Sequence, residues 1–264
     1  MFSICLCSWN DLEYLKILIQ SIQKNTRMIH EIIVHDNGSE DGTEEWLRAN
    51  DILYSRTPTN EGVAAVNYAV ERAKYPYIIN INADMHVFPN WDTEIYKQIR
   101  AFEKEGIEKF TISSCLVEPI GANPEYTVSY HGHNPETFSE ASLMMDYFTT
   151  PSKYVKMNTT QYSHPITIPK ALWDEFGGVD TGYQYGIGTD HDIPASAYKV
   201  GCRNFIMLGK SKVYHFISQT VKKLPQKRED GQLYFKNKWG MTVSEFRQKM
   251  GIAKPYRRVD DGIL

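Results

Sequence analysis

Residues 31–43 read EIIVHDNGSEDGT, and this stretch decides the fold class. The apolar run Glu31–His35 predicts a buried strand, and the turn-forming run Asp36–Gly42 follows it without a gap. Thr43 then begins a short predicted helix that ends at Leu47. A strand that passes through a polar turn into a helix is the building unit of an α/β fold with a parallel sheet.

The same alternation continues on both sides of this stretch. From their apolar spacing, we expect strands over Phe2–Ser8, Ile52–Ser55 and Tyr77–Ile81, and helices over Leu12–Gln23 and Gly62–Lys74. Strands and helices in alternation imply right-handed crossovers onto a mostly parallel sheet. Such sheets bind ligands beyond the carboxyl ends of their strands. Candidate ligand contacts therefore lie in three segments: Ser8–Asp11, Asp36–Ser39 and Asn82–His86.

The rest of the chain is less regular. Residues 118–164 are rich in Tyr, His, Pro, Asn and Thr, which predicts long loops with short strands. From Ile166 a strand, a helix over Lys170–Phe176, a helix over Pro194–Val200 and a strand ending at His215 are expected. Because no repeat or low-complexity linker is visible, the simplest partition is one domain with a C-terminal extension.

Composition excludes several classes of protein. The chain has 264 residues, 42% apolar and 23% charged, as in one globular domain and unlike disordered or fibrous proteins. No run approaches the roughly 18–20 apolar residues of a membrane span, and no basic segment precedes the first strand, so no secretory signal is expected. Four scattered cysteines suit buried thiols rather than a disulfide framework. We expect a cytoplasmic protein.

The charge is unevenly distributed. From Lys210 onward the chain has 13 basic and 5 acidic residues, although its overall net charge is −3. A basic tail indicates contact with a phosphate-bearing ligand, a membrane surface or another subunit, and a basic helix packed on an acidic body explains it equally well. We expect no nucleic-acid partner.

The tail itself contains an amphipathic pattern. We expect a helix near Val243–Met250 that docks on the body with Phe246 inward, the stretch before it being anchored by three aromatic residues, Tyr234, Phe235 and Trp239. The alternative is peripheral attachment to anionic lipid through the same aromatic side chains.

Several carboxylates follow predicted strands. Asp36 could accept hydrogen bonds from a nucleobase or a ribose, whereas Ser39 and Asp41 are expected to shape the turn and cap the next helix. Asp84 with His86 two residues on suits a divalent cation that bridges phosphates. Asp190 and Asp192 form a second acidic pair, in which Asp192 is also a candidate helix cap before Pro194.

In their order along the chain these elements resemble family 2 glycosyltransferases of the GT-A fold, from about Phe2 to Ser218. The matching motifs are Cys7-Ser8-Trp9-Asn10, Asp36–Thr43, Asn60-Glu61-Gly62 with Ala65 and Asn67, Asn82-Ala83-Asp84, Gly177-Gly178-Val179-Asp180, Thr189-Asp190-His191-Asp192, and Val213-Tyr214-His215. Three positions depart from the family's pattern. Asn82 stands for the first Asp of Asp-x-Asp, Thr189 replaces a Glu, and Ser196 stands where an Arg is usual.

The resemblance implies an α/β GT-A fold, with a Rossmann-like, mostly parallel sheet flanked by helices and a C-terminal helical extension. It divides the chain into a glycosyltransferase domain over 1–218, with a nucleotide-binding half (1–115) and an acceptor half (116–218), and an extension over 219–264. The implied donor-binding residues are Ser8, Trp9, Asn10, Asp36, Asn60, Gly62, Asn67, Asn82, Ala83, Asp84 and Gly178.

The implied reaction is inverting transfer of a hexosyl or deoxyhexosyl group. A nucleotide-diphosphate sugar, UDP- or dTDP-linked, would donate to a glycan, a lipid-linked acceptor or another hydroxyl. Mn²⁺ or Mg²⁺ would be held by Asp84 and His215, with His86 as a conceivable extra ligand. Asp190 would be the general base, with Thr189 and Asp192 on the acceptor side. Ser218, Lys222 and Lys223 would belong to a lid over the diphosphate, or to a solvated loop.

Two rival functions remain at this point. A non-catalytic GT-A-like module would bind a nucleotide sugar or a glycan without transfer, but the presence of Asp84, Asp190 and His215 together argues against it. A sugar-nucleotide nucleotidyltransferase would need a glycine-rich, basic loop after the first strand, and Ser8–Asp11 has none.

Overall fold

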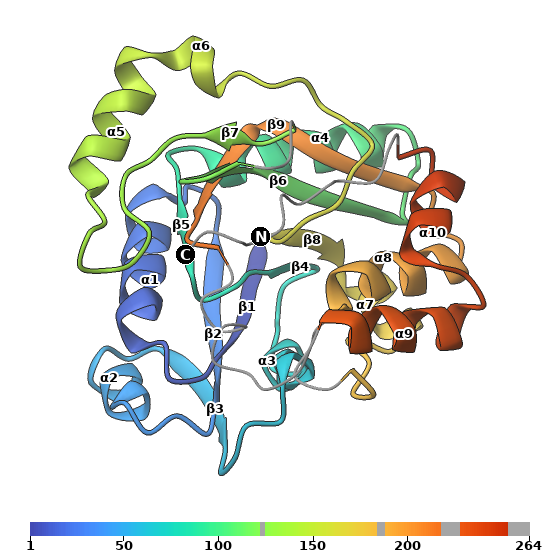
Figure 1. The fold of residues 1–264 in the computed structure, drawn as a ribbon, viewed down its shortest axis with the longest axis horizontal. Coiled ribbons are helices and arrows are strands. Elements are labelled where there is room, and N and C mark those ends of the chain that lie inside the picture. Colours follow the sequence, from blue (N-terminus) through green and yellow to red (C-terminus); the bar gives the residue numbers. More distant parts are fainter. Residues whose placement is uncertain (122–124, 184–187, 218–227, 253–264) are drawn as a thin grey trace.

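The structure is a computed structural model, and it describes residues 1–121, 125–183, 188–217 and 228–252. The elements run in the order β1 (Phe2–Ser8), α1 (Leu12–Asn25), β2 (His30–Asn37), α2 (Thr43–Ala49), β3 (Leu53–Thr57), a 3₁₀ turn η1 (Val63–Ala65), α3 (Val66–Val70), β4 (Tyr77–Asn80), β5 (Met85–Val87), α4 (Trp91–Lys104), β6 (Phe110–Glu118), β7 (Thr127–Val128), α5 (Glu140–Thr149), α6 (Pro151–Tyr154), β8 (Ile166–Pro169), α7 (Lys170–Phe176), α8 (Thr189–Lys199), β9 (Asn204–His215), α9 (Arg228–Trp239) and α10 (Val243–Lys249) (Figure 1). The predicted strands of the first third therefore form, with ends within two residues of those expected.

One mixed sheet runs through the molecule in the order β3-β2-β1-β4-β8-β6-β9-β5, with β7 beside β6. The first four strands are parallel, as the alternation predicts. β8 runs antiparallel to both β4 and β6, β9 is parallel to β6, and β5 is antiparallel to β9. The carboxyl ends of β1, β2, β4, β6 and β9 therefore share one edge with the amino ends of β8 and β5. This edge is called the ligand edge below.

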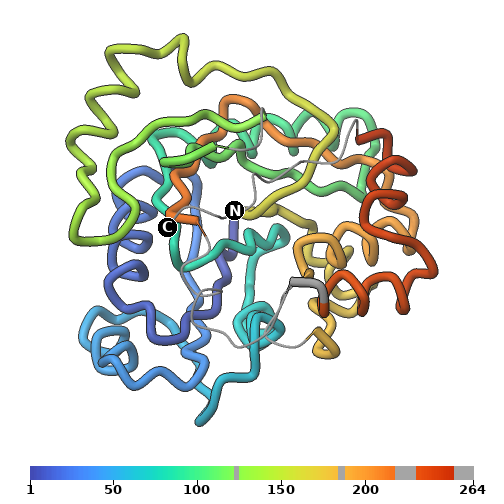
Figure 2. The backbone as a smooth tube through the Cα atoms, viewed as in Figure 1, coloured from blue at the N-terminus to red at the C-terminus, as the bar shows by residue number. Residues whose placement is uncertain are grey.

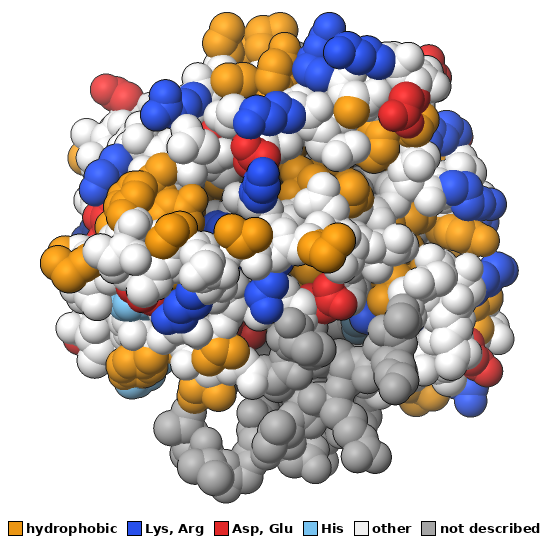
Figure 3. All heavy atoms as spheres, turned by 90° about the horizontal axis from the view of Figure 1, so that it is seen from above, with side chains coloured by type: hydrophobic (Ala, Val, Ile, Leu, Met, Phe, Trp, Pro, Cys, Tyr) orange, Lys and Arg blue, Asp and Glu red, His pale blue; other side chains and the backbone are white. Residues whose placement is uncertain are grey.

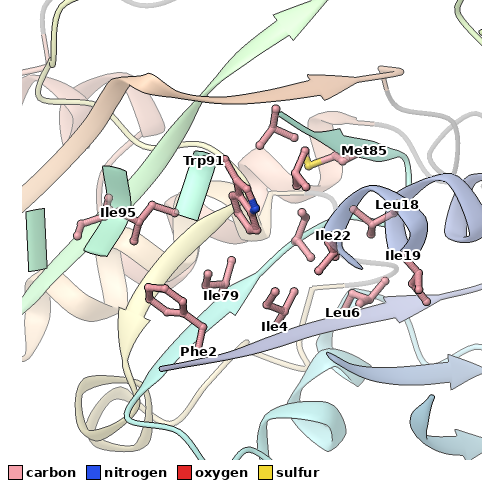
Figure 4. Packing of buried hydrophobic residues seen from close by; sticks show 14 of the residues in the cluster. Phe2, Ile4, Leu6, Leu18, Ile19, Ile22, Ile79, Met85, Trp91 and Ile95 are labelled. Carbon is pink, nitrogen blue, oxygen red and sulfur yellow. The ribbon is translucent and has the colours of Figure 1, made fainter. Parts of the chain in front are cut away.

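Helices cover both faces of the sheet, and the strands alternate their side chains between them. Phe2, Ile4 and Leu6 of β1 are buried toward α1 and α4, whereas Cys5 between them is buried toward α3, α7 and α8. Figure 4 shows the first of these clusters, in which Trp91 at the start of α4 lies close to Met85 of β5. Alternate side chains of β1 are thus buried on opposite faces of the sheet, as in the central strand of an α/β sheet.

Two expectations from the sequence are wrong in detail. The helix expected over Gly62–Lys74 is only the short pair η1 and α3. Residues 118–164 do not consist only of loops and short strands, because α5 and α6 lie within them. Helix α5 begins where the Ser139 side chain accepts a hydrogen bond from the Ser142 amide, and its Leu143 is fully buried. One buried position in a short helix leaves almost no periodic signal in the sequence.

The C-terminal helices pack on the body. Phe235 of α9 and Phe246 of α10 are 0% and 3% exposed, in a cluster with Tyr162, Tyr183 and Ala195 of the main domain. Figure 2 shows this red end of the chain lying against the segment of α7 and α8. No helix within the described residues is long and apolar enough to span a membrane.

Candidate functional site

Asp84 and His215 meet at the ligand edge, as the resemblance implies. His215 ends β9, Asp84 precedes β5, and these two strands pair antiparallel. The His215 Nε2 atom lies 3.7 Å from Asp84 Oδ2, and the Phe216 amide donates to the Asp84 carbonyl over 3.1 Å. Two atoms that commonly bind metal ions, His215 Nε2 and Asp84 Oδ2, therefore lie opposite each other, and the pairing of β9 with β5 fixes their positions.

Glu118, which the sequence analysis did not single out, orients His215. It ends β6, and its Oε1 lies 2.9 Å from His215 Nδ1. A carboxylate on one ring nitrogen of a histidine leaves the other nitrogen free to bind a metal, which is the usual outer-shell arrangement of metal-binding histidines. Burial lowers the pKa of His215, but the charge of Asp84 and the hydrogen bond with Glu118 outweigh it and hold this pKa above its ordinary value.

This arrangement fits a divalent cation that is shared with a ligand. Within the described ranges no group of three or more His, Cys, Asp or Glu side chains could hold a metal ion by itself. Asp84 and His215 would hold the ion together with oxygen atoms of a bound diphosphate. His86, the conceivable third ligand, instead lies 3.4 Å from Glu140 of α5, because successive side chains of β5 point to opposite faces.

Asp190 also lies at this edge, and His164 holds it. The His164 Nδ1 atom is 2.9 Å from Asp190 Oδ1, and its Nε2 atom is 3.2 Å from the Asn80 amide nitrogen. If Asn80 donates to Nε2, then Nδ1 carries the proton and donates to Asp190. Desolvation raises the pKa of Asp190, but the hydrogen bond and charge of His164 outweigh it and hold this pKa below its ordinary value.

Asp192 does not cap a helix, contrary to the expectation. Helix α8 begins at Thr189, five residues before the predicted start, and its N-cap is Gly188 in the left-handed conformation. The Asp192 carboxylate is buried and receives three donors, which are Tyr183 Oη at 3.0 Å, Trp239 Nε1 at 2.7 Å and Lys238 Nζ at 2.9 Å. Asp192 therefore joins α8 to α9, while Asp190 keeps one oxygen atom for other partners.

The turn after β2 lies at the other end of the site. The Asp36 carboxylate is fully buried, accepts from the Ser39 amide over 3.0 Å and pairs with Arg56, its register partner on β3. The Ser39 hydroxyl accepts from the Asn10 amide, and Asp41 accepts from the Thr43 hydroxyl and the Leu12 amide, so both shape the turn as expected. Neither is the N-cap of α2, because Gly42 occupies that position without a side-chain cap, so this part of the expectation is wrong.

Ser8, at the end of β1, offers a different observation. It is 2% exposed, and its hydroxyl has no hydrogen-bond partner within the described part of the chain. Buried polar groups normally have partners, so this hydroxyl at the strand end could bond a ligand that binds there. Trp9 and Asn10 follow it and are partly exposed, and Asn10 has a φ of 53°.

Other predicted donor residues link the segments around the site. Asn60 accepts from the Asn37 side chain and from the Gly62 amide. The Asn67 side chain on α3 forms two hydrogen bonds with the backbone of Val179, at 2.8 and 2.9 Å. A Cβ atom on Gly178 would lie 2.5 Å from the Asn67 oxygen and 3.0 Å from Trp173 Nε1, and its φ is +75°. Only glycine fits there.

The structure describes only some of the remaining predicted site residues. Asn82 and Ala83 form the turn between β4 and β5, and Thr189 is buried at the first position of α8. Ser218, Lys222 and Lys223 lie outside the described residues. Glu118 and His164 are the two residues that the sequence analysis missed. Glu118 is the last residue of β6, and His164 lies two residues before β8, so both are at the ligand edge. A prediction of where these two strands end and begin could have identified them.

Comparison with known proteins finds one family model and several solved structures that are similar to this chain. Residues 3–108 match the model of glycosyl transferase family 2. No curated protein matches the chain in sequence. Among solved structures, S. aureus TarS 1–349 is similar with a TM-score of 0.58 and 14% identity, over 95% of this chain and 77% of that one.

Two further crystal structures hold ligands. TarS 1–349 in complex with UDP has a TM-score of 0.57 and 13% identity, over 94% of this chain and 74% of that one. TarS 1–349 in complex with UDP-GlcNAc has a TM-score of 0.57 and 14% identity, over 97% and 68%. The longer TarS structure is covered to 42% of its length. At these identities the likeness establishes the fold, which is GT-A.

Proposed function

From the match of residues 3–108 to the model of glycosyl transferase family 2, we propose that the protein is an inverting glycosyltransferase that uses a nucleotide-diphosphate sugar and a divalent cation. The donor is a UDP- or dTDP-linked hexose or deoxyhexose, and the acceptor is a hydroxyl of a glycan or a lipid-linked molecule. The complexes of TarS with UDP and UDP-GlcNAc support the choice of uridine.

One observation carries the proposal. The facing pair of Asp84 and His215 and the carboxylate of Asp190 stand at the same edge of one sheet, although they come from three distant parts of the chain. A diphosphate held at the first pair would leave its sugar beside the carboxylate. A binding module without chemistry has no need of a base that a histidine orients at this place.

The chain's own residues supply most of the mechanism. The orphaned Ser8 hydroxyl and the turn at Asp36 would receive the nucleoside, and Asp84 and His215 would receive the cation with the diphosphate. A bound Mn²⁺ or Mg²⁺ offsets the charge that develops on the departing diphosphate. Asp190 would take the proton of the acceptor hydroxyl as this oxygen attacks the anomeric carbon from the opposite face.

His164 would assist by orientation. With one oxygen of Asp190 occupied by His164 Nδ1, the other is left for the acceptor hydroxyl. Because Asp190 has a lowered pKa, it stays ionised at neutral pH, as a general base must. Asp192 has its carboxylate filled by three donors and is unsuited to this role.

The test is release of nucleotide diphosphate from a panel of UDP-, dTDP- and GDP-sugars, with Mn²⁺ or with EDTA, and with and without glycan acceptors. We expect turnover with a uridine or thymidine donor that EDTA abolishes. Asp190→Asn should lower kcat by about 10²–10⁴-fold, which is the usual contribution of a general base, and leave donor affinity little changed. Donor binding without any transfer or hydrolysis across the panel would instead identify a binding module.

A further inference from the structure

The arm formed by α5, α6 and the residues after them carries uncovered apolar side chains. Met145 and Phe148 of α5 are 69% and 65% exposed, and Val155 and Met157 beyond α6 are 63% and 85% exposed. Met145 and Phe148 are three residues apart and so share one face of the helix. Single exposed apolar residues are ordinary, but four within thirteen positions are typical of an interaction surface. We call residues 145–157 the outer arm.

The outer arm is firmly held from below. Leu143 and Tyr154 are 0% and 2% exposed, in a cluster with Phe88 and Tyr214 of the main domain. The Asp146 carboxylate accepts from Ser129 Oγ at 2.8 Å, from Tyr154 Oη at 2.7 Å and from Lys153 Nζ at 2.6 Å. The exposed apolar side chains are therefore carried by a segment that is held to the main domain.

Lysines surround the apolar side chains. Lys153 and Lys156 belong to the arm, and Met157 lines an open depression together with Lys156, Lys97 of α4 and Lys210 of β9. Two of these four lysines are in ion pairs, Lys153 with Asp146 at 2.6 Å and Lys97 with Glu94 at 2.7 Å, so Lys156 and Lys210 supply the net positive charge of this surface. Figure 3 looks down on this side of the molecule and shows apolar patches with Lys and Arg side chains between them, and acidic side chains among these.

We propose that the outer arm and the lysines beside it bind the surface of an anionic lipid bilayer. The pattern has both parts of an interfacial site, apolar side chains that enter the acyl boundary and lysines that meet the phosphates. The aromatic residues of the C-terminal segment suit this purpose less well, because Phe235 is fully buried, Trp239 packs in the same cluster, and the Tyr234 hydroxyl donates to Asp180. A second copy of this chain is a less suitable partner for the outer arm. A two-fold interface would place the outer arm of one copy against that of the other and would bring their lysines together.

The test is co-sedimentation of the purified protein with vesicles of neutral phosphatidylcholine, alone or mixed with an anionic phospholipid, at low and high salt. We expect binding to the anionic vesicles only, weakened by salt. Phe148→Ser and Met157→Ser should each weaken it by about tenfold, near the lower end of what a large apolar side chain contributes. Lys156→Gln and Lys210→Gln should each weaken it by about fivefold, since each surface lysine contributes about 1 kcal/mol.

Matched controls lie elsewhere on the surface. Leu233 on α9 is 58% exposed, and the Lys74 side chain is 72% exposed. Leu233→Ser and Lys74→Gln should bind vesicles like the parent protein. The proposal is overturned if the parent does not bind, if the arm variants bind like the controls, or if sedimentation shows a dimer that Phe148→Ser dissociates. No turnover is measured, so failure here leaves the proposed transfer reaction untouched.

Discussion

The ammonium group of Lys238 joins two carboxylates, lying 2.6 Å from Asp180 and 2.9 Å from Asp192. Asp180 follows the Gly177-Gly178 turn, and Asp192 lies in the first turns of α8, two residues after Asp190. Helix α9 therefore fixes two segments that border the site. The C-terminal extension is in this sense part of the main domain, because these ion pairs and the cluster around Phe235 hold it there.

Asp192→Asn should lower the free energy of unfolding and have a smaller effect on the turnover rate. The variant leaves the ammonium of Lys238 without its buried partner, which costs about 1–3 kcal/mol. For a chain of this size that corresponds to a fall in melting temperature of roughly 2–12 °C. Differential scanning calorimetry measures the shift, and Asp174→Asn, at an exposed pair with Lys170, is the matched control. If the melting temperature of Asp192→Asn equals that of the control, Asp192 does not contribute to the stability of the fold.

Glu140 should contribute stability that acid removes. Its pKa is lowered to about 2 by His86 first and Lys24 second, from an ordinary value of 4.5. The carboxylate therefore stabilises the fold above about pH 4.5, and this contribution is lost as the pH falls toward 2. Because the side chain is 37% exposed, we expect Glu140→Gln to cost only about 1 kcal/mol at pH 7.

Urea unfolding of Glu140→Gln at pH 7, 5 and 3 measures this effect. The difference from the parent should shrink between pH 5 and pH 3, whereas Glu71→Gln, at an exposed position, should resemble the parent throughout. A difference that stays constant with pH would mean that the charge of Glu140 is not the source of its contribution.

The sequence predicted the part of the site that depends on parallel strands. Alternating elements placed Ser8, Asp36 and Asp84 near the ends of strands at one edge, and the sheet has them there. Arg56 was not foreseen as the partner of Asp36, because pairing across two strands depends on register, which twenty residues of intervening chain do not reveal.

The part that was missed depends on strand direction and helix starts. His164 reaches the ligand edge only because β8 runs antiparallel, and an apolar run such as Ile166–Pro169 looks the same in either direction. Pro194 suggested that α8 begins there, since proline favours the first turn. The helix instead starts at Thr189, after the N-cap Gly188, whose left-handed φ is a backbone feature without a unique sequence signal.

Asp84→Ala should remove the metal dependence of donor binding. Isothermal titration of UDP with Mn²⁺ should show strong binding to the parent protein and weak binding to the variant, which should no longer differ between Mn²⁺ and EDTA. Glu118→Gln should weaken the metal effect by about 10–100-fold, because Glu118 acts on the metal site only through His215. Glu175→Gln, at an exposed pair with Lys109, is the control. Equal UDP affinity of the parent in Mn²⁺ and in EDTA would contradict the metal site.

His164→Ala should change the pH dependence of turnover rather than donor binding. In the parent protein His164 helps to hold the pKa of Asp190 below its ordinary value, so this carboxylate, the proposed base, stays ionised as the pH falls. Without this hydrogen bond the pKa of Asp190 rises, and the acidic limb of kcat/KM should move to higher pH. His164→Asn keeps an amide donor near the position of Nδ1 and should restore part of the parent profile. Initial rates between pH 4 and pH 8, with the donor KM measured at each point, separate this role from a loss of folding. An acidic limb that is unchanged in His164→Ala would show that His164 does not act through Asp190.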